Sequence, residues 1–242
     1  MNNSNKVSII IPALNEEGRI SFVLDIALEA KNKIDEIEEV IVVDDGSEDN
    51  TKQEAEKKDV DKLIVHKKNK GKAEALKSGV EKSEGNILFF IDADLINFRI
   101  KHIKKVLNPI LYQNYNMVNG VLDRGKQFKK ITGENDFTNK IAPLINEYNS
   151  SFLGSKITGI RTIKREIWNK TPAVKKFYID KAIYETAKEI DKTKIKNVVL
   201  PELFQYSKPK KRGPKGHLDR IKMWGEILLK TIGDKTKKLL NY

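Results

Sequence analysis

The chain has 242 residues, a formal net charge of +12 and no cysteine. This length suffices for one large domain or for a domain with an extension, and the lack of cysteine excludes disulfides, thiolate chemistry and zinc–thiolate sites. Residues 2–6 are polar, and the sequence contains no apolar run of about 18 residues. We therefore expect neither a signal peptide nor a membrane-spanning helix, and a cytoplasmic location.

The positive charge is concentrated in residues 207–242. This segment contains eleven Lys or Arg against three acidic residues, so it carries +8 of the net +12. Such a segment favours an anionic partner, such as a membrane surface, a nucleic acid or a phosphorylated substrate, although the same composition also serves solubility alone. We expect a domain over residues 1–206, followed by a basic linker and a C-terminal helix over residues 207–242.

Short apolar runs and helical patterns alternate along the first part of the chain. The expected strands cover residues 7–11, 40–43, 63–65 and 86–91, and the expected helices begin near residues 15, 50 and 72. Pro12 is predicted to end the first strand, Asn15 to cap the first helix, and Asn50 with Gln53 to form a capping box. The alternation predicts an α/β fold with a mostly parallel, doubly wound sheet and helices on both faces.

The fourth expected strand ends on two carboxylates, Asp92 and Asp94. In an extended strand residues i and i+2 point to the same side, so both side chains would face one pocket, or they would share it through a turn. Two carboxylates at the end of a buried strand need a cationic partner. A divalent metal with a phosphorylated ligand meets this need, and an ordinary acidic turn is the alternative interpretation.

The second part of the chain continues less regularly. Helical patterns cover residues 103–111, 136–149 and 183–190, and strand patterns cover residues 117–122, 156–162 and 198–201. Residues 123–151 are rich in polar side chains, as is typical of a loop that contacts an acceptor. An amphipathic helix is predicted over residues 221–232.

The loops after the expected strands all carry polar or charged residues, and in a parallel sheet these loops meet at its carboxyl edge, where such folds bind ligands. Neither the G-x-G-x-x-G pattern nor the P-loop pattern is present in the sequence. Dinucleotide oxidoreductases and P-loop NTPases are therefore disfavoured.

Four segments resemble, in order and spacing, the motifs of family 2 nucleotide-sugar glycosyltransferases of the GT-A fold. They are residues 11–16, 42–47, 71–76 and 90–94. The resemblance covers residues 6–98, which would form the nucleotide-sugar half of the domain, with the acceptor half at residues 99–206. Residues 92–97, and more loosely 158–166 and 177–180, are similar to glucosyl-3-phosphoglycerate synthases.

The resemblance implies a metal-dependent transfer of a sugar from a nucleotide diphosphate sugar, with UDP-glucose the first choice, to an acceptor that bears phosphate or a lipid. It implies that ten residues bind the donor: Pro12, Ala13, Leu14, Asn15, Glu16, Asp45, Gly46, Lys72, Asp92 and Ala93. The charge of Lys72 suits a departing diphosphate, whereas Asp45 suits a hydrogen bond to a base or a ribose.

The resemblance also implies a metal site and an acceptor-side carboxylate. Asp94 would bind Mn²⁺ or Mg²⁺, with His217 as a further ligand, while His66 and His102 are interpreted as structural or surface residues. Asp180 would be the base of an inverting enzyme or a positioning group of a retaining one. A simple helix cap at Asp180 is the alternative.

Other classes of protein remain open. A nucleotidyltransferase also uses paired carboxylates on an α/β sheet, although the loop after the first strand is acidic here rather than basic and glycine-rich. A nucleic-acid-binding protein acting through the basic segment lacks a recognition motif. The amphipathic helix, which contains Trp224 and Ile227, suits an anionic membrane surface, its own domain or the second subunit of a homodimer.

Overall fold

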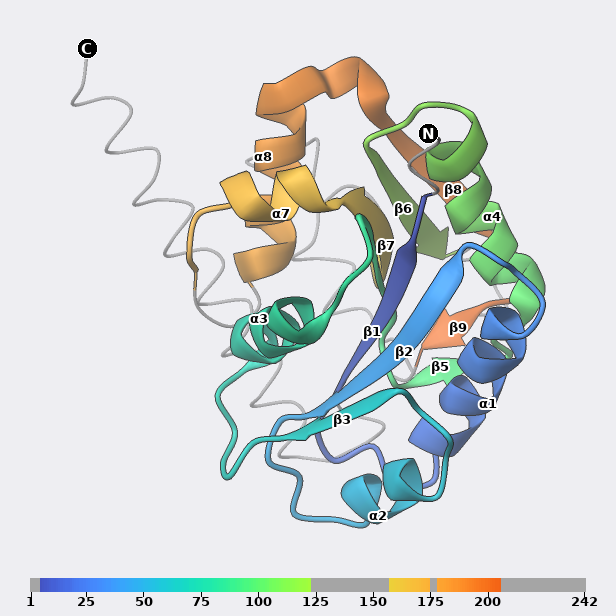
Figure 1. Ribbon diagram of the computed structural model, residues 1–242, viewed down its shortest axis with the longest axis vertical. Coiled ribbons are helices and arrows are strands. Elements are labelled where there is room, and N and C mark those ends of the chain that lie inside the picture. The colour runs from blue at the N-terminus through green and yellow to red at the C-terminus, as the bar shows by residue number, and fades with distance from the viewer. Residues whose placement is uncertain (1–4, 123–156, 175–177, 206–242) are drawn as a thin grey trace, which may run out of the picture. The chain divides into compact units, whose positions relative to one another are not determined.

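The computed structural model describes residues 5–122, 157–174 and 178–205 (Figure 1). Its strands are β1 (Val7–Ala13), β2 (Ile37–Asp44), β3 (Lys62–Val65), β4 (Ile87–Phe90), β5 (Leu95–Ile96), β6 (Met117–Leu122), β7 (Ile157–Lys164), β8 (Ile195–Leu200) and β9 (Phe204–Gln205). Its helices are α1 (Ile20–Lys31), α2 (Thr51–Glu56), α3 (Lys72–Lys82), α4 (Ile100–Tyr112), α7 (Arg165–Lys170), α8 (Ile179–Asp191) and the short 3₁₀ helix η2 (Lys192–Lys194).

Seven strands form one sheet in the order β3-β2-β1-β4-β7-β6-β8, and β5 and β9 form a small second sheet. Strands β1 to β4 are parallel to one another, and β8 is parallel to β6. Strand β7 runs antiparallel to both β4 and β6. The prediction of a mostly parallel α/β sheet is confirmed.

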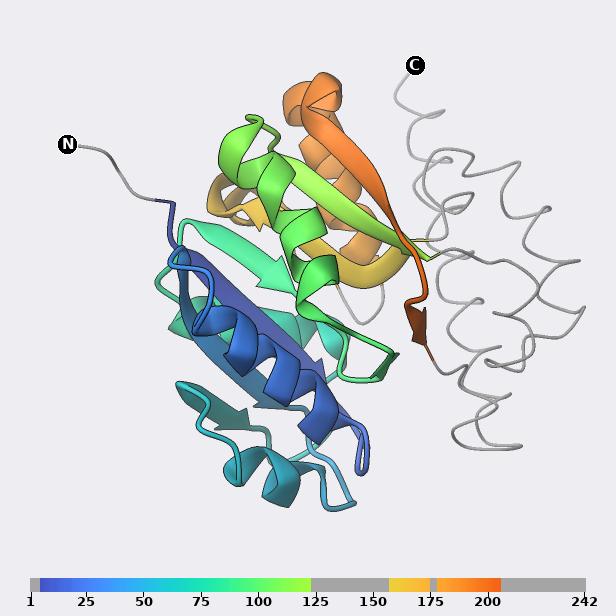
Figure 2. The same ribbon diagram turned by 90° about the vertical axis from the view of Figure 1, so that its right-hand side faces the viewer.

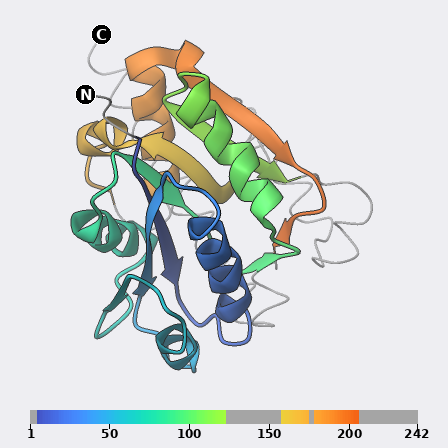
Figure 3. The same ribbon diagram turned by 45° about the vertical axis from the view of Figure 1, so that its right-hand side comes forward.

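Helices cover both faces of the sheet. Helices α1 and α4 lie on one face, and α3, α7 and α8 lie on the other (Figures 1 and 3); α1 and α4 are in front of the sheet in Figure 2. All four residues of β4 are buried, as are Ile9 to Ile11 of β1 and Val40 to Val43 of β2. Continuous apolar runs of this kind are required where a strand is covered on both faces.

At the amino edge of the sheet, where β1 to β4 begin, a buried carboxylate links residues of neighbouring strands. Glu39, only 4% exposed, accepts hydrogen bonds from Ser8 Oγ and Glu84 N, both at 2.6 Å, and Lys62 Nζ lies at 2.7 Å. Burial by itself would raise the pKa of Glu39, but the bonds from Lys62, Ser8 and Glu84 lower it below the ordinary value. We call Ser8, Glu39, Lys62 and Glu84 the amino-edge cluster.

Strand β1 does not end at Pro12, as the sequence had predicted, but continues to Ala13. Ile10 O accepts a hydrogen bond from Ile91 N, so the main-chain N–H and C=O groups of Ile10 point towards β4. The main chain of Pro12, two residues further along, points to the same side. Pairing with β4 stops at Ile10, however, and Pro12 pairs only with Val43 of β2. Pro12 therefore lacks its N–H only on the side facing β4, where β1 no longer makes ladder hydrogen bonds.

Two predicted helix caps are also wrong. Helix α1 begins at Ile20, and Asn15 adopts a left-handed backbone with φ of 55°. The side chain of Asn15 instead accepts a bond from Glu48 N (2.8 Å), which ties the loop after β1 to the loop after β2. Asn50 precedes α2 without a side-chain cap, and its amide donates to Glu17 Oε1. Contacts distant in sequence prevail over the local capping pattern.

Elements α4, β6, β7, α8 and β8 follow the predicted order, with β6 at the predicted residues 117–122. Helix α7 and the short strands β5 and β9 were not predicted. The helix expected at residues 136–149, the basic linker and the amphipathic helix at 221–232 lie outside the described residues. Among the described residues, none of the helices has both the length and the apolar character needed to cross a bilayer.

Candidate active site at the carboxyl edge

The carboxyl edge of the sheet gathers side chains from distant parts of the chain. Strand β4 ends at Phe90, and a turn then carries Asp92 and Asp94. The pair therefore sits in a turn and not in an extended strand, which was the second of the two predicted geometries. Helix α3 begins beside them at Lys72, and helix α8 brings Asp180 in its first turn.

Lys72, Asp92 and Asp180, all predicted from the sequence, meet through their charged groups. The ammonium of Lys72 lies 3.2 Å from Asp92 Oδ1 and 3.3 Å from Asp180 Oδ2. The three side chains are between 15% and 21% exposed, so they are partly accessible at this edge. One lysine on α3 thus connects the predicted donor-side and acceptor-side carboxylates.

Lys72 remains positively charged in this environment. Burial alone would lower the pKa of its ammonium, but the charges of Asp180 and Asp92 more than offset burial, and the pKa lies above the ordinary value. Arg161 opposes this increase. A lysine held in its charged form beside two carboxylates is suited to an anionic ligand such as a diphosphate.

Arg161 on β7 completes this group, and the sequence interpretation assigned it no role. Arg161 is 1% exposed. Its Nη2 lies 3.1 Å from Asp180 Oδ1, and its Nη1 donates to the main-chain oxygen of Asp180 at 3.1 Å. The available signal was an arginine inside an otherwise apolar strand pattern, which needs a buried counter-ion. We call Lys72, Asp92, Arg161 and Asp180 the carboxyl-edge cluster.

Gly159, two residues before Arg161 on β7, fixes the second oxygen of Asp92. Its main-chain N–H donates to Asp92 Oδ2 at 3.1 Å. A Cβ atom at Gly159 would lie 2.0 to 2.1 Å from the Asp92 carboxyl atoms, which real atoms do not tolerate. Any side chain at this position would therefore force the Asp92 carboxylate to move.

Asp94 is 7% exposed and Ala93 is 3% exposed in the turn after β4. Within the described parts of the chain there is no group of three or more His, Cys, Asp or Glu residues that could hold a metal by themselves. Mg²⁺ and Mn²⁺ are hard cations, and Mg²⁺ sites commonly use one or two protein carboxylates together with substrate phosphates and water. Asp94 supplies a carboxylate, the ligand type of such sites, but metal binding by Asp94 stays a prediction, and His217 lies outside the described residues.

Asp45, predicted to bind the donor, is 3% exposed and holds the loop that leads into α3. Its Oδ1 lies 2.7 Å from His66 Nδ1 and accepts from Lys70 N at 3.0 Å, and its Oδ2 accepts from Gly71 N at 2.7 Å. These bonds place Lys72 through the preceding residues. A contact between Asp45 and a base or ribose stays a prediction.

Gly46 follows Asp45 with φ of 76°, and a Cβ atom there would lie 2.5 Å from the backbone of Lys68. This close approach holds the loop after β2 against the loop after β3. The loop after β1, which contains Leu14 and Glu16, is held against the start of α2, since Glu16 N donates to Thr51 Oγ1 at 2.7 Å. Ala13 is the last residue of β1. The predicted donor-binding loops therefore lie side by side, and their contact with a nucleotide stays a prediction.

Both described histidines are structural, as the sequence interpretation held. His66 is buried between Asp45 and Ser78. His102 accepts from Arg99 N at the start of α4, and its Nε2 lies 3.0 Å from Pro201 O. Burial lowers the pKa of His102, which favours the neutral ring that these two contacts require.

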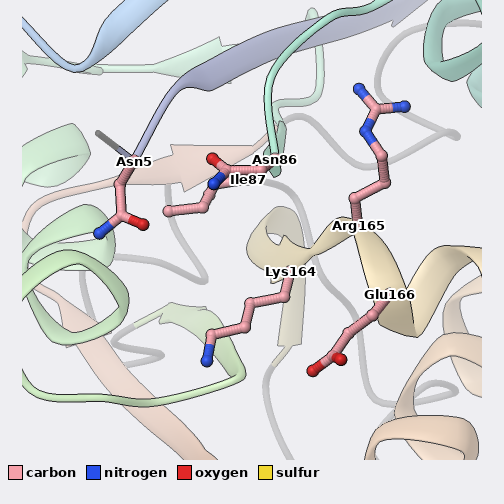
Figure 4. Close-up of a pocket in the computed structure, with 6 residues that line it drawn as sticks. All are labelled: Asn5, Asn86, Ile87, Lys164, Arg165 and Glu166. Carbon is pink, nitrogen blue, oxygen red and sulfur yellow. The ribbon is translucent and has the colours of Figure 1, made fainter. Parts of the chain in front are cut away.

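A separate hollow of about 300 Å³ opens at the amino edge and not near the carboxyl-edge cluster. Figure 4 shows its lining side chains, in which Arg165 turns away from Lys164 and Glu166. The guanidinium of Arg165 donates to Gly85 O (2.7 Å) and Ser83 O (2.9 Å). The polar groups of this hollow therefore do not converge on one point.

The fold and the gathered loops define the class of GT-A α/β enzymes. The structure is similar to crystallised glucosyl-3-phosphoglycerate synthase from Mycobacterium tuberculosis, with a TM-score of 0.72, 22% identity, and coverage of 94% of this chain and 78% of that one. That crystal contains Mn²⁺, UDP and glucosyl-3-phosphoglycerate. The sequence profile described as glycosyl transferase family 2 matches residues 8–172. The chain belongs to glycosyl transferase family 2.

Curated relatives match a shorter stretch. Human dolichyl-phosphate beta-glucosyltransferase is 37% identical over 102 residues, which cover 38% of this chain and 32% of the relative. Undecaprenyl-phosphate 4-deoxy-4-formamido-L-arabinose transferase from Proteus mirabilis is 33% identical over 98 residues, covering 38% of this chain and 30% of the relative. The matched stretch thus spans about a third of these relatives.

Proposed function

We propose that the chain transfers a sugar from a nucleotide diphosphate sugar, with UDP-glucose the first choice, to a phosphate-bearing acceptor that is either small or lipid-linked. The observation that carries this proposal is the carboxyl-edge cluster, in which Lys72 connects Asp92 and Asp180 at 3.2 and 3.3 Å. A cation between two carboxylates, at the ligand-binding edge of a family 2 fold, is suited to a diphosphate leaving group next to an acceptor hydroxyl.

The donor half of the reaction rests on the first four loops. Lys72 binds the diphosphate and stabilises the charge that develops as the sugar leaves. Asp92 accepts hydrogen bonds from ribose or sugar hydroxyls, and the loop from Pro12 to Glu16 holds the base. Asp94, with His217 as a further ligand, would hold Mn²⁺ or Mg²⁺, which supplies charge neutralisation at the diphosphate when bound.

The acceptor half rests on Asp180. In an inverting reaction its carboxylate takes the proton of the attacking hydroxyl, and in a retaining reaction it only orients the acceptor. The names of the curated relatives specify lipid phosphates, and the similar crystal structures contain phosphoglyceric acid or a glucosylated form of it. Both kinds of acceptor carry a phosphate, which is the shared chemistry that we propose here.

A donor screen tests the proposal. Hydrolysis and transfer of UDP-glucose, UDP-galactose, GDP-mannose and other nucleotide sugars would be measured with 3-phosphoglycerate or a polyprenyl phosphate, with Mn²⁺, with Mg²⁺ and with EDTA. We expect one UDP-sugar to be consumed only with a divalent cation. Equal UDP binding with Mn²⁺ and with EDTA in isothermal titration would contradict the proposed metal dependence. Release of pyrophosphate from UTP and a sugar phosphate would indicate a nucleotidyltransferase instead.

Asp94→Ala tests the assigned metal residue. We expect UDP affinity in this variant to become insensitive to Mn²⁺, together with loss of transfer, because the proposed ion has lost its carboxylate. Glu81→Gln on the exposed side of α3 is a matched control that also removes one negative charge. Retained Mn²⁺ dependence in Asp94→Ala would show that the metal has another ligand set.

For the basic segment we propose peripheral contact with the inner, cytoplasmic face of an anionic membrane. Its charge of +8 and its amphipathic pattern support the proposal. The full chain should co-sediment with phosphatidylglycerol liposomes, and a full-length variant with Lys210, Lys211 and Arg212 changed to Glu should not. Equal co-sedimentation of the two proteins would leave packing on the domain or on a second subunit as the role of this segment.

A further inference from the structure

Strand β7 supplies the contacts that hold both carboxylates of the carboxyl-edge cluster. Gly159 donates its main-chain N–H to Asp92, and Arg161 contacts Asp180 through two separate nitrogens. Residues two apart on a strand point to the same face, so one short stretch of β7 serves both carboxylates. The two halves of the proposed reaction are thereby placed relative to one another by a single rigid element.

The contact between Arg161 and Asp180 fixes both position and orientation. Nη1 bonds the main-chain oxygen of Asp180 and Nη2 lies 3.1 Å from Oδ1 of the same residue, so the planar guanidinium holds the backbone and the carboxylate at once. The other carboxylate oxygen, Oδ2, is left facing Lys72 at 3.3 Å. Oδ2 is thus the oxygen on the side of Lys72.

Stability of the helix does not account for Arg161. Helix α8 starts without a side-chain cap, and a cation near a helix N-terminus is opposed by the helix dipole. A buried ion pair is in general weak evidence for stability, because desolvation of both charges offsets most of their attraction. What a two-point contact does provide is a fixed geometry.

We propose that Arg161 is a positioning residue, which fixes the first turn of α8 so that Oδ2 of Asp180 meets the acceptor. This inference rests on the proposed glycosyl transfer. Arg161 is 1% exposed, and its guanidinium contacts both the main-chain oxygen and the carboxylate of Asp180. Displacement of Asp180 therefore impairs transfer to the acceptor while the donor, held by the loops after β1 to β4, still binds and is still slowly hydrolysed by water.

The test compares Arg161→Gln and Arg161→Lys with the wild-type full-length chain. Transfer of glucose from UDP-glucose to 3-phosphoglycerate or decaprenyl phosphate, hydrolysis of UDP-glucose in water, and UDP binding with Mn²⁺ would be measured. We expect transfer by Arg161→Gln to fall about 100-fold, as for a displaced catalytic group, with UDP binding and hydrolysis unchanged. Arg161→Lys keeps the charge but makes a single contact, so it should recover part of the transfer rate.

Arg165→Lys is the matched control, since Arg165 is also an arginine on this part of the chain but bonds to main-chain oxygens at the amino edge. It should lower the melting temperature and leave the ratio of transfer to hydrolysis unchanged. A parallel fall of transfer, hydrolysis and UDP binding in Arg161→Gln would overturn the inference, as would an unchanged transfer rate.

Hydrogen exchange separates this inference from the proposed function. If wild-type protein consumes no nucleotide sugar, the proposed function fails, and exchange at the amides of residues 178–184 still decides the positioning role. Faster exchange confined to this turn in Arg161→Gln supports the role of Arg161. Unchanged exchange, or an equal increase across the whole sheet, contradicts it.

Discussion

The two edges of the sheet both contain buried charge, but they satisfy it differently. In the amino-edge cluster Glu39 receives a hydroxyl, a main-chain N–H and an ammonium at 2.6 to 2.7 Å. In the carboxyl-edge cluster the side-chain contacts of Lys72 are 3.2 and 3.3 Å long, and each joins two groups that are partly exposed. The first arrangement joins strands, whereas the second is made of contacts that a charged ligand can replace.

This difference follows from the direction of the strands. Parallel strands begin at one edge, where tight connections bury their first residues, and end at the other, where loops of variable length diverge. Ser8 and Glu39 are built into the strands themselves, while Asp92 and Lys72 lie just outside them. We therefore expect substitutions at the amino edge to alter stability, and substitutions at the carboxyl edge to alter activity.

The largest effect is expected for Lys72→Met. The variant loses the cation that faces the diphosphate, so transfer should fall about 100- to 1,000-fold, as when one preorganised stabilising group is removed. Steady-state kinetics with UDP-glucose would measure this loss. Lys77→Met, on the exposed side of the same helix, should retain wild-type kinetics; a similar loss in both variants would mean that Lys72 has no special role.

Glu39→Gln tests the other edge. The variant removes the charge of a buried carboxylate, while its partner Lys62 is 33% exposed and keeps its contact with Glu84. The free energy of unfolding should therefore fall by about 1.5 kcal/mol. Urea denaturation would measure it, with Glu38→Gln, which sits in an exposed pair with Lys6, as control. UDP binding by the folded fraction should be unchanged, and a loss of binding without a loss of stability would reverse the assignment of the two edges.

The same substitution at both edges sharpens the comparison. Gly159→Ala places a methyl group on Asp92, and Gly85→Ala places one 2.6 Å from Lys6 O and 2.7 Å from Ser8. Overpacking of this kind costs about 1 to 3 kcal/mol, so both variants should melt earlier. Only Gly159→Ala should also lose transfer per folded molecule. Equal turnover in the two variants would show that the position of Asp92 does not matter.

The two edges should contribute differently to the pH dependence of stability. The lowered pKa of Glu39 contributes stability that is complete above the ordinary value of 4.5 and is lost as pH falls through the lowered pKa. The raised pKa of Lys72 contributes stability that is complete below the ordinary value of 10.5 and is lost as pH rises through the raised pKa.

Melting temperatures of three proteins would measure this difference. The Glu39→Gln variant should flatten the acid limb of the curve and, because Glu39 also raises the pKa of Lys62, part of the alkaline limb. Lys72→Met should flatten only the alkaline limb. An alkaline limb that is the same in Lys72→Met and in the wild type would contradict the contribution of the carboxyl-edge cluster to stability.

The smallest effect is expected for Lys164→Met in the amino-edge hollow. The polar groups that line this hollow point in different directions, and Arg165 is occupied by main-chain oxygens. Transfer rate, UDP affinity and melting temperature should all match the wild type, as for most substitutions away from the core, buried polar groups and ligand sites. Weaker UDP binding in this variant would show that the amino edge also takes part in ligand binding.

Much of the fold was predictable because burial on both faces of a parallel sheet imposes a pattern that the sequence records directly. Continuous apolar runs predicted β1 to β4, and the alternation with amphipathic helices predicted the mostly parallel sheet. Lys72 and Asp92 were predicted too, since polar residues recur after successive strands, whereas Asp180 was predicted from the family resemblance. Where local rules failed, at Pro12, Asn15 and Asn50, a partner distant in sequence had replaced the local one.

By itself the sequence determined the class of fold, the family motifs and the carboxylates of the site, because each depends on residue type at short spacing. Only the tertiary structure decided that Asp45 holds the loop before Lys72, that Gly159 bonds Asp92 and that Arg161 holds Asp180. These contacts join residues between 19 and 67 positions apart. The physical reason is that hydrogen bonds and ion pairs act over about 3 Å in space, and no local periodicity encodes which distant residues the packing of a sheet brings within that range.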